Sequence, residues 1–148
     1  MEGRYITEDF EQHELKNIFA DSTILVAEDI EINREILHLM LECTGINIEY
    51  AKDGKTALEM FSADPEKYNL IFTDINMPEM DGLETARKIR AQGGRGKDIP
   101  IIAVTANVLR KDIEKCTAAG MNDYIGKPLE QTKLINKLQK YLTPVLPD

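Results

Sequence analysis

Short stretches of uninterrupted apolar residues limit the fold of this chain more than any other feature of its sequence. Three of them are Thr23–Ala27, the run that begins at Leu70, and Ile99–Thr105. Such a stretch is too short and too uniformly apolar for a surface helix, and it is typical of a parallel strand buried on both faces. Pro100 is tolerated because it stands at the start of its strand. The sequence therefore predicts three buried strands.

Two further strand signals and five helical patterns complete the expected architecture. Ile46 to Tyr50 alternates between apolar and polar residues, which predicts a strand at the edge of the sheet, and Asp123 to Gly126 predicts a short fifth strand. Apolar residues recur at helical spacing in five other segments, 31–43, 57–61, 83–89, 109–116 and 134–142. Because strands that alternate with helices form parallel sheets, we expect an α/β fold, a doubly wound (βα)5 sheet with helices on both faces.

The remaining segments flank or connect these elements. Residues 1–22 are polar and acidic and predict an N-terminal extension, either a short amphipathic helix or a linker, while 144–148 form a C-terminal tail. Three glycines within 93–98 predict a flexible surface loop. In segment 31–43 the apolar residues at helical spacing are Ile32, Ile36, Leu39, Met40 and Cys43, so we expect an amphipathic helix whose apolar face packs on the sheet.

The composition limits the classes of partner that the chain can bind and the cellular location that we expect for it. With 18 basic and 26 acidic residues the net charge is −8, which repels nucleic-acid backbones and anionic membranes on average. No apolar run approaches the roughly 18 residues of a membrane span, and residues 1–20 lack the apolar core of a signal peptide. Cys43 and Cys116 match no metal-binding or redox spacing. We expect a cytoplasmic chain with reduced thiols, no nucleic-acid partner and no membrane contact.

Charged and polar residues gather where the predicted strands end. Glu28 and Asp29 follow the first strand, Asp74 ends the third, Thr105 ends the fourth and Lys127 follows the fifth. In this fold these ends share one edge of the sheet, where open α/β proteins build their sites. Three carboxylates in one cleft repel each other unless they are protonated, spread apart or bound to a cation. Mg²⁺ is the simplest solution, because it prefers oxygen ligands and leaves room for a phosphate.

A carboxylate in this position can serve as a nucleophile. Asp74 would form an aspartyl phosphate, and phosphoryl transfer requires mainly positioning and charge neutralisation at three phosphoryl oxygens. Mg²⁺ would neutralise one oxygen, the Lys127 ammonium a second, and the Thr105 hydroxyl would donate to a third. The predicted set of groups is chemically complete.

The motifs at these positions resemble those of two-component receiver domains. They are Val26-Ala27-Glu28-Asp29, Phe72 to Gly82, Val104-Thr105-Ala106 and Gly126-Lys127-Pro128, and they lie within Thr23 to Leu142. Glu31-Ile32-Asn33-Arg34 and the stretch from Lys115 to Tyr124 further resemble the receivers of hybrid sensor histidine kinases. The resemblance implies a receiver domain over 23–143, with a flavodoxin-like sheet of strand order 2-1-3-4-5.

The resemblance also implies the phosphoryl donor and the metal ligands. Asp74 would accept phosphate from a phosphohistidine, carried by a histidine kinase or a histidine phosphotransfer protein. Asp29, Asp74 and the Asn76 carbonyl would bind Mg²⁺, and Glu28 would act through metal-bound water. Such a chain is a signalling module rather than an enzyme proper, with self-catalysed phosphorylation and autodephosphorylation.

A conformational switch is implied as well. Thr105 and Tyr124 would respond to phosphorylation and remodel the surface of the fourth helix, fifth strand and fifth helix. The peptide bond before Pro128 would be cis. Whether phosphorylation also produces a homodimer is left open.

Three other functions compete with this interpretation. A Mg²⁺-dependent phosphatase resembling the haloacid dehalogenase superfamily would also use an aspartyl phosphate, but that superfamily has a second Asp where this chain has Asn76. A nucleotide- or flavin-binding module needs glycines after the first strand, where this chain has Glu28-Asp29-Ile30-Glu31. A receiver-like docking module that is never phosphorylated has no physical need for three clustered carboxylates.

Overall fold

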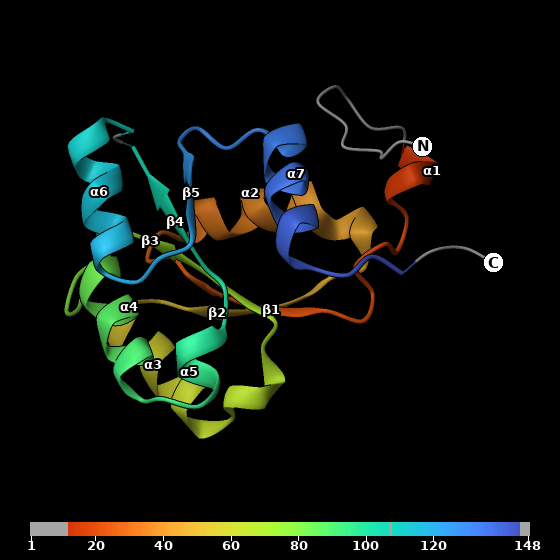
Figure 1. Ribbon diagram of the computed structural model, residues 1–148. Coiled ribbons are helices and arrows are strands. Elements are labelled where there is room, and N and C mark those ends of the chain that lie inside the picture. Colours follow the sequence, from red (N-terminus) through yellow and green to blue (C-terminus); the bar gives the residue numbers. More distant parts are fainter. Residues whose placement is uncertain (1–11, 107, 146–148) are drawn as a thin grey trace.

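The computed structural model describes residues 12–106 and 108–145 (Figure 1). The strands in these residues are β1 (Thr23–Ala27), β2 (Asn47–Ala51), β3 (Leu70–Asp74), β4 (Ile101–Thr105) and β5 (Asp123–Gly126). The helices are α1 (Gln12–Leu15), α2 (Glu31–Leu41), α3 (Gly54–Ala63), α4 (Gly82–Ala91), α5 (Arg95–Asp98), α6 (Arg110–Ala118) and α7 (Gln131–Tyr141), with 3-10 turns η1 (Glu42–Thr44) and η2 (Pro65–Lys67).

The strands form one parallel sheet in the order β2-β1-β3-β4-β5. The chain first adds β2 beside β1 and then crosses back to add β3 on the other side, so the strand order reverses between β1 and β3. The crevice at such a reversal is where open α/β sheets bind ligands. The predicted (βα)5 fold and strand order are confirmed, and β2 lies at the edge that its alternating sequence predicts.

Each face of the sheet is covered by its own layer of helices and has its own core (Figure 1). On one face Leu37 and Leu41 of α2 pack with Leu134 and Leu138 of α7. The opposite core contains residues of α3, α4 and α6, among them Phe61. Both faces of the central strands are therefore buried, as their uninterrupted apolar sequences require.

Local capping residues mark where several of the helices begin and end. Asp53 caps α3 by accepting from the Thr56 amide at 2.7 Å, and Asp81 caps α4 by accepting from the Glu84 amide at 2.9 Å. Gly120 follows α6 with a φ of 97°, a left-handed conformation that glycine adopts without strain.

The expected inner face of α2 was wrong in part, because Met40 and Cys43 pack against the core but the other three residues do not. Ile32, Ile36 and Leu39 are 57%, 40% and 68% exposed, and the buried residues of this helix are Leu37 and Leu41. Both sets recur at helical spacing, so the pattern alone does not decide which one meets the sheet. As a consequence α2 presents an apolar stripe to solvent.

The segment before β1 packs on the domain. Leu15 and Phe19 are almost fully buried in the same core as α2 and α7, and the amides of Asn17 and Phe19 donate to the carbonyls of Cys43 and Thr44 at 2.8 and 2.9 Å. The division of the chain at residue 22 stays a prediction, and residues 1–11 lie outside the described part. The hydrophobic core nevertheless includes residues before position 22, such as Leu15 and Phe19.

The segment 93–98 differs from the predicted flexible loop, because it contains the short helix α5. Gly96 is buried there, with the Ile89 carbonyl so close that a Cβ would lie 2.3 Å from it. Within the described residues no helix combines the length and the apolar character that a membrane span requires.

Candidate functional site

The strand register brings the predicted site residues to one edge of the sheet. Ala27 pairs with Thr73, so Glu28 and Asp29 follow β1 beside Asp74 at the end of β3. Asp74 pairs with Val104, and Thr105 pairs with Gly126, which precedes Lys127. The predicted site residues therefore stand at the ends of β1, β3, β4 and β5, which lie side by side in this order in the sheet.

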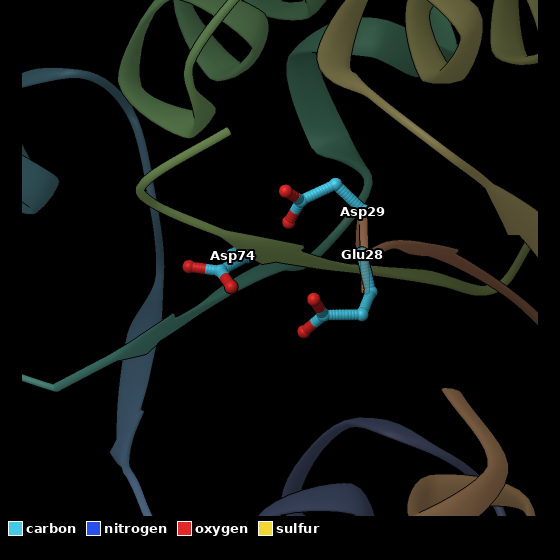
Figure 2. A group of neighbouring side chains, drawn as sticks. All are labelled: Glu28, Asp29 and Asp74. Atoms are coloured by element: carbon cyan, nitrogen blue, oxygen red, sulfur yellow. The ribbon is translucent and has the colours of Figure 1, made fainter. Parts of the chain in front are cut away.

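The three carboxylates converge from the ends of β1 and β3 (Figure 2). One oxygen from each of Glu28, Asp29 and Asp74 lies within 4.8 Å of the others. Glu28 and Asp74 are buried, with 7% and 5% exposure, and Asp29 is partly exposed. This arrangement gives a cation both a cluster of oxygen ligands and an opening to solvent.

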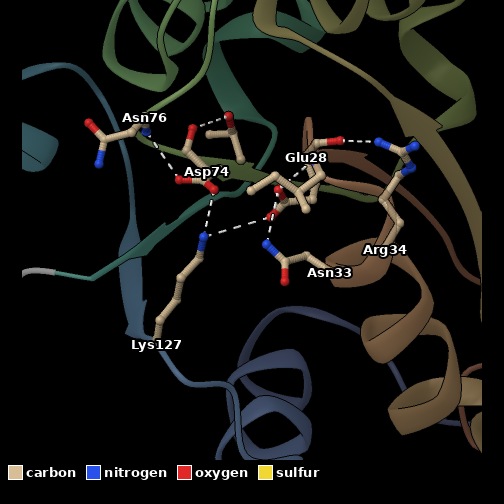
Figure 3. Close-up of polar contacts among 8 residues, drawn as sticks. Glu28, Asn33, Arg34, Asp74, Asn76 and Lys127 are labelled. Atoms are coloured by element: carbon tan, nitrogen blue, oxygen red, sulfur yellow. Dashed lines mark hydrogen bonds and ion pairs between the residues drawn. The ribbon is translucent and has the colours of Figure 1, made fainter.

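Lys127 is the cation that faces the cluster (Figure 3). Its Nζ lies 2.7 Å from Asp74 Oδ2 and 3.8 Å from Glu28 Oε1. On the other side of the Asp74 carboxylate, the Asn76 amide donates to Oδ1 at 3.1 Å. Both oxygens of Asp74 are therefore oriented by donors from opposite directions.

The electrostatics of the site reflect burial of several charges together. Burial raises the pKa of Glu28 and the nearby Asp74 charge raises it further, although the Ile30 amide and Lys127 oppose this. Burial would lower the pKa of Lys127, but the hydrogen bond to Asp74 and the charges of Asp74, Glu28 and Asp29 outweigh it and raise the pKa. The lysine stays protonated, and one ammonium faces three carboxyl groups.

Thr105 and Tyr124 lie on β4 and β5, the two strands that follow β3 across the sheet. Thr105 is buried at the end of β4, and its carbonyl accepts from the Lys127 amide at 2.9 Å. Tyr124 is half-buried in β5, and Lys137 Nζ lies 5.2 Å from the centre of its ring. The Lys127-Pro128 peptide bond is cis, as predicted.

Two residues that contact Glu28 received no role from the sequence. Asn33 Nδ2 donates to Glu28 Oε2 at 3.4 Å, and an Arg34 guanidinium nitrogen donates to the Glu28 carbonyl at 2.7 Å. Their positions could have indicated a role in the site, because the first turn of a helix that follows a strand lies directly over the end of that strand. Polar residues there can reach back to the site.

The comparison with protein families agrees with this geometry. The model of the response regulator receiver domain family matches residues 24–139. The aerobic respiration control sensor protein ArcB of Escherichia coli is 39% identical over 118 residues, covering 80% of this chain and 15% of that protein. The chain spans only 7% to 15% of the lengths of the first kinases that it matches.

Two solved structures share the fold. A receiver domain of a Pseudomonas aeruginosa sensor histidine kinase, with a magnesium ion coordinated in its active site cleft, is 38% identical with a TM-score of 0.72, covering 81% of this chain and 96% of that one. The receiver domain of Ssk1 in complex with the histidine phosphotransfer signaling protein Ypd1 of Saccharomyces cerevisiae is 29% identical with a TM-score of 0.73, covering 81% and 88%. The chain therefore belongs to the response regulator receiver domain family, the receiver modules of two-component signalling.

Proposed function

We propose that Asp74 accepts a phosphoryl group from a phosphohistidine. The observation that carries this proposal is the position of Asp74 inside the cluster. It is buried beside two other carboxylates, its Oδ2 is 2.7 Å from the Lys127 ammonium, and the Asn76 amide orients its other oxygen. A carboxylate held at both oxygens has a fixed orientation and still keeps lone pairs for attack, and a fixed nucleophile is what an in-line transfer requires.

The transfer can be written with these groups. An Asp74 carboxylate oxygen attacks the phosphorus, and the P–N bond to the imidazole breaks. The imidazole nitrogen keeps the electron pair and takes up a proton from solvent. The Lys127 ammonium neutralises charge on one phosphoryl oxygen, and the Thr105 hydroxyl donates to another. With a small phosphodonor the same groups would make the step self-catalysed.

The residues present fit a magnesium ion. Three carboxyl groups whose oxygens approach within 4.8 Å of one another, with one lysine facing them, leave an excess of negative charge in a partly buried site. Asp29 and Asp74, with the Asn76 carbonyl, would hold the ion, and Glu28 would act through its bound water. When bound, Mg²⁺ supplies charge neutralisation and a fixed position for the phosphoryl group.

A histidine phosphotransfer domain is the donor that we propose. The exposed residues Ile32, Ile36 and Leu39, which we call the α2 patch, are an unusual amount of apolar surface for one short helix. Ile36 also lines a groove of about 480 Å³ together with Glu28 and Lys127, so the patch adjoins the site. The Ssk1 receiver in complex with Ypd1 supports this kind of partner.

Thr105 and Tyr124 are the proposed switch. Ala103 of β4 pairs with Tyr124 of β5, and Thr105, two residues later in β4, pairs with Gly126. A movement of the Thr105 side chain toward a phosphoryl group on Asp74 would leave room for the Tyr124 ring to turn inward. That movement would change the surface formed by α6, β5 and α7.

The test is the intact mass of the protein incubated with acetyl phosphate and Mg²⁺. We expect the mass of one added phosphate, which forms only with Mg²⁺ and does not form when EDTA is present. The added phosphate should be lost at alkaline pH and should be absent from Asp74→Asn. Asp81→Asn is the matched control, because Asn caps helices as well as Asp and the α4 cap should survive. A phosphate on Asp74→Asn would show that another residue is the acceptor, and rapid donor turnover without an adduct would indicate a phosphatase.

A further inference from the structure

The carboxylate of Glu28 is held by the first turn of α2 (Figure 3). Its Oε2 accepts from the Ile30 amide at 3.0 Å and from Asn33 Nδ2 at 3.4 Å. Its other oxygen, Oε1, faces Lys127 Nζ at 3.8 Å. One oxygen of the carboxylate is thus directed to the helix, and the other is directed to the site.

The main chain beneath this carboxylate is fixed from two sides. The Glu28 amide donates to the Ala51 carbonyl of β2 at 3.0 Å, and the Glu28 carbonyl accepts from Arg34 at 2.7 Å. Arg34 is itself tied to β2, because the Tyr50 hydroxyl donates to its carbonyl at 3.3 Å. With the backbone fixed, the direction of the Glu28 carboxylate depends on its side-chain torsions and therefore on the two donors at Oε2.

We propose that Asn33 is a positioning residue for Mg²⁺ binding, acting through Glu28; this inference rests on the proposed function of the acidic site. The alternative partner of Glu28 is Lys127, which is 3.8 Å away and already bound to Asp74. Without the Asn33 donor the carboxylate can turn toward that ammonium and form a closer ion pair. Glu28 would then leave the place from which it serves a cation and would compete with Asp74 for the lysine.

The experiment replaces Asn33 by leucine, which has a similar volume and no donor. Titration calorimetry with MgCl₂ should give a dissociation constant about tenfold weaker than that of the wild type. This is the low end for loss of a residue in the outer shell of a metal site, because the Asn33–Glu28 hydrogen bond is long. The phosphorylation rate at saturating Mg²⁺ should stay within about twofold, and stability in EDTA should not change. Asn33→Gln keeps an amide donor and should recover most of the affinity.

Asn69→Leu is the matched control, since Asn69 accepts from the Thr23 amide at 2.8 Å at the far end of β1 and should not affect Mg²⁺. If Asn33→Leu binds Mg²⁺ as the wild type does, the inference is wrong while the proposed function stands. The inference is equally wrong if the affinity is unchanged and only the rate at saturating Mg²⁺ falls. If the wild type neither binds Mg²⁺ nor takes up phosphate, both proposals are overturned.

Discussion

Replacement of Asp123 by asparagine tests how β5, the strand that carries Tyr124, is fastened to α7. The Asp123 side chain is 9% exposed and accepts from Lys137 Nζ at 2.6 Å, Lys140 Nζ at 2.9 Å and the Tyr141 hydroxyl at 3.0 Å. Lys137 also lies over the ring of Tyr124. One carboxylate therefore anchors three residues of α7 to the start of the strand.

The pKa of Asp123 gives the magnitude. Burial would raise this pKa, but the hydrogen bonds from Lys137 and Lys140 and from the Tyr124 amide outweigh it and lower the pKa from 3.8 to about 2. At about 1.4 kcal/mol per pKa unit, the ionised carboxylate stabilises the folded state by about 2 kcal/mol at pH 7. Because the folded-state pKa is the lower one, this stabilisation is present above pH 3.8 and is lost as the pH falls through about 2.

The assay is urea unfolding followed by circular dichroism at pH 7 and pH 3. Asp123→Asn should lower the free energy of unfolding by about 2 kcal/mol at pH 7 and by about 1 kcal/mol at pH 3. The same replacement at exposed Asp21 should cost less than about 0.5 kcal/mol at both pH values. A loss for Asp123→Asn that matches the Asp21 control at pH 7, or that grows as the pH falls, would refute the reasoning.

Three further changes test the packing, the turn beneath the site and the docking surface. Phe19→Ala should lower the free energy of unfolding by about 3 to 5 kcal/mol in urea, whereas a segment that is only a linker would lose nothing. Gly82→Ala should cost about 1 to 3 kcal/mol and slow phosphorylation by acetyl phosphate, because its Cβ would lie 2.3 Å from the Asp74 carbonyl; a native rate would show that the turn adapts. Leu39→Glu should slow transfer from a phosphorylated histidine phosphotransfer domain by about tenfold and leave the acetyl phosphate rate unchanged. The equally exposed Leu109→Glu should change neither rate, and an equal loss there would argue against the α2 patch.

The fold and the clustering of the predicted site residues followed from local sequence because each part has a local cause. A strand buried on both faces must be apolar along its length, so β1 and β3 were recognisable, with the bounds Thr23–Ala27 and Leu70–Asp74. The parallel arrangement then placed every strand end on one edge. The residues that follow those ends, such as Asp29 and Lys127, could be assigned to one site before any side chain was positioned.

The parts that could not be predicted depend on contacts between distant segments. Leu37 and Ile36 are neighbours on α2, and only the position of the helix on the sheet makes one buried and the other exposed. Phe19 belongs to a largely polar segment, and its burial depends on the surface that α2 and α7 form together. Asn33 contributes through a single side-chain hydrogen bond, which composition and spacing do not reveal.

The segments near the two ends of the described chain pack together, away from the acidic site. The Val145 amide donates to the Ile18 carbonyl at 2.6 Å, and the Ser22 carbonyl accepts from the Asn47 amide, so both ends meet at the edge where β1 and β2 begin. Asp74 lies at the opposite edge, where the strands end. The packed segments around Ile18 and Val145 therefore lie away from the acidic site and leave it open to a phosphodonor. The burial of Phe19 also fixes the direction in which the chain enters β1.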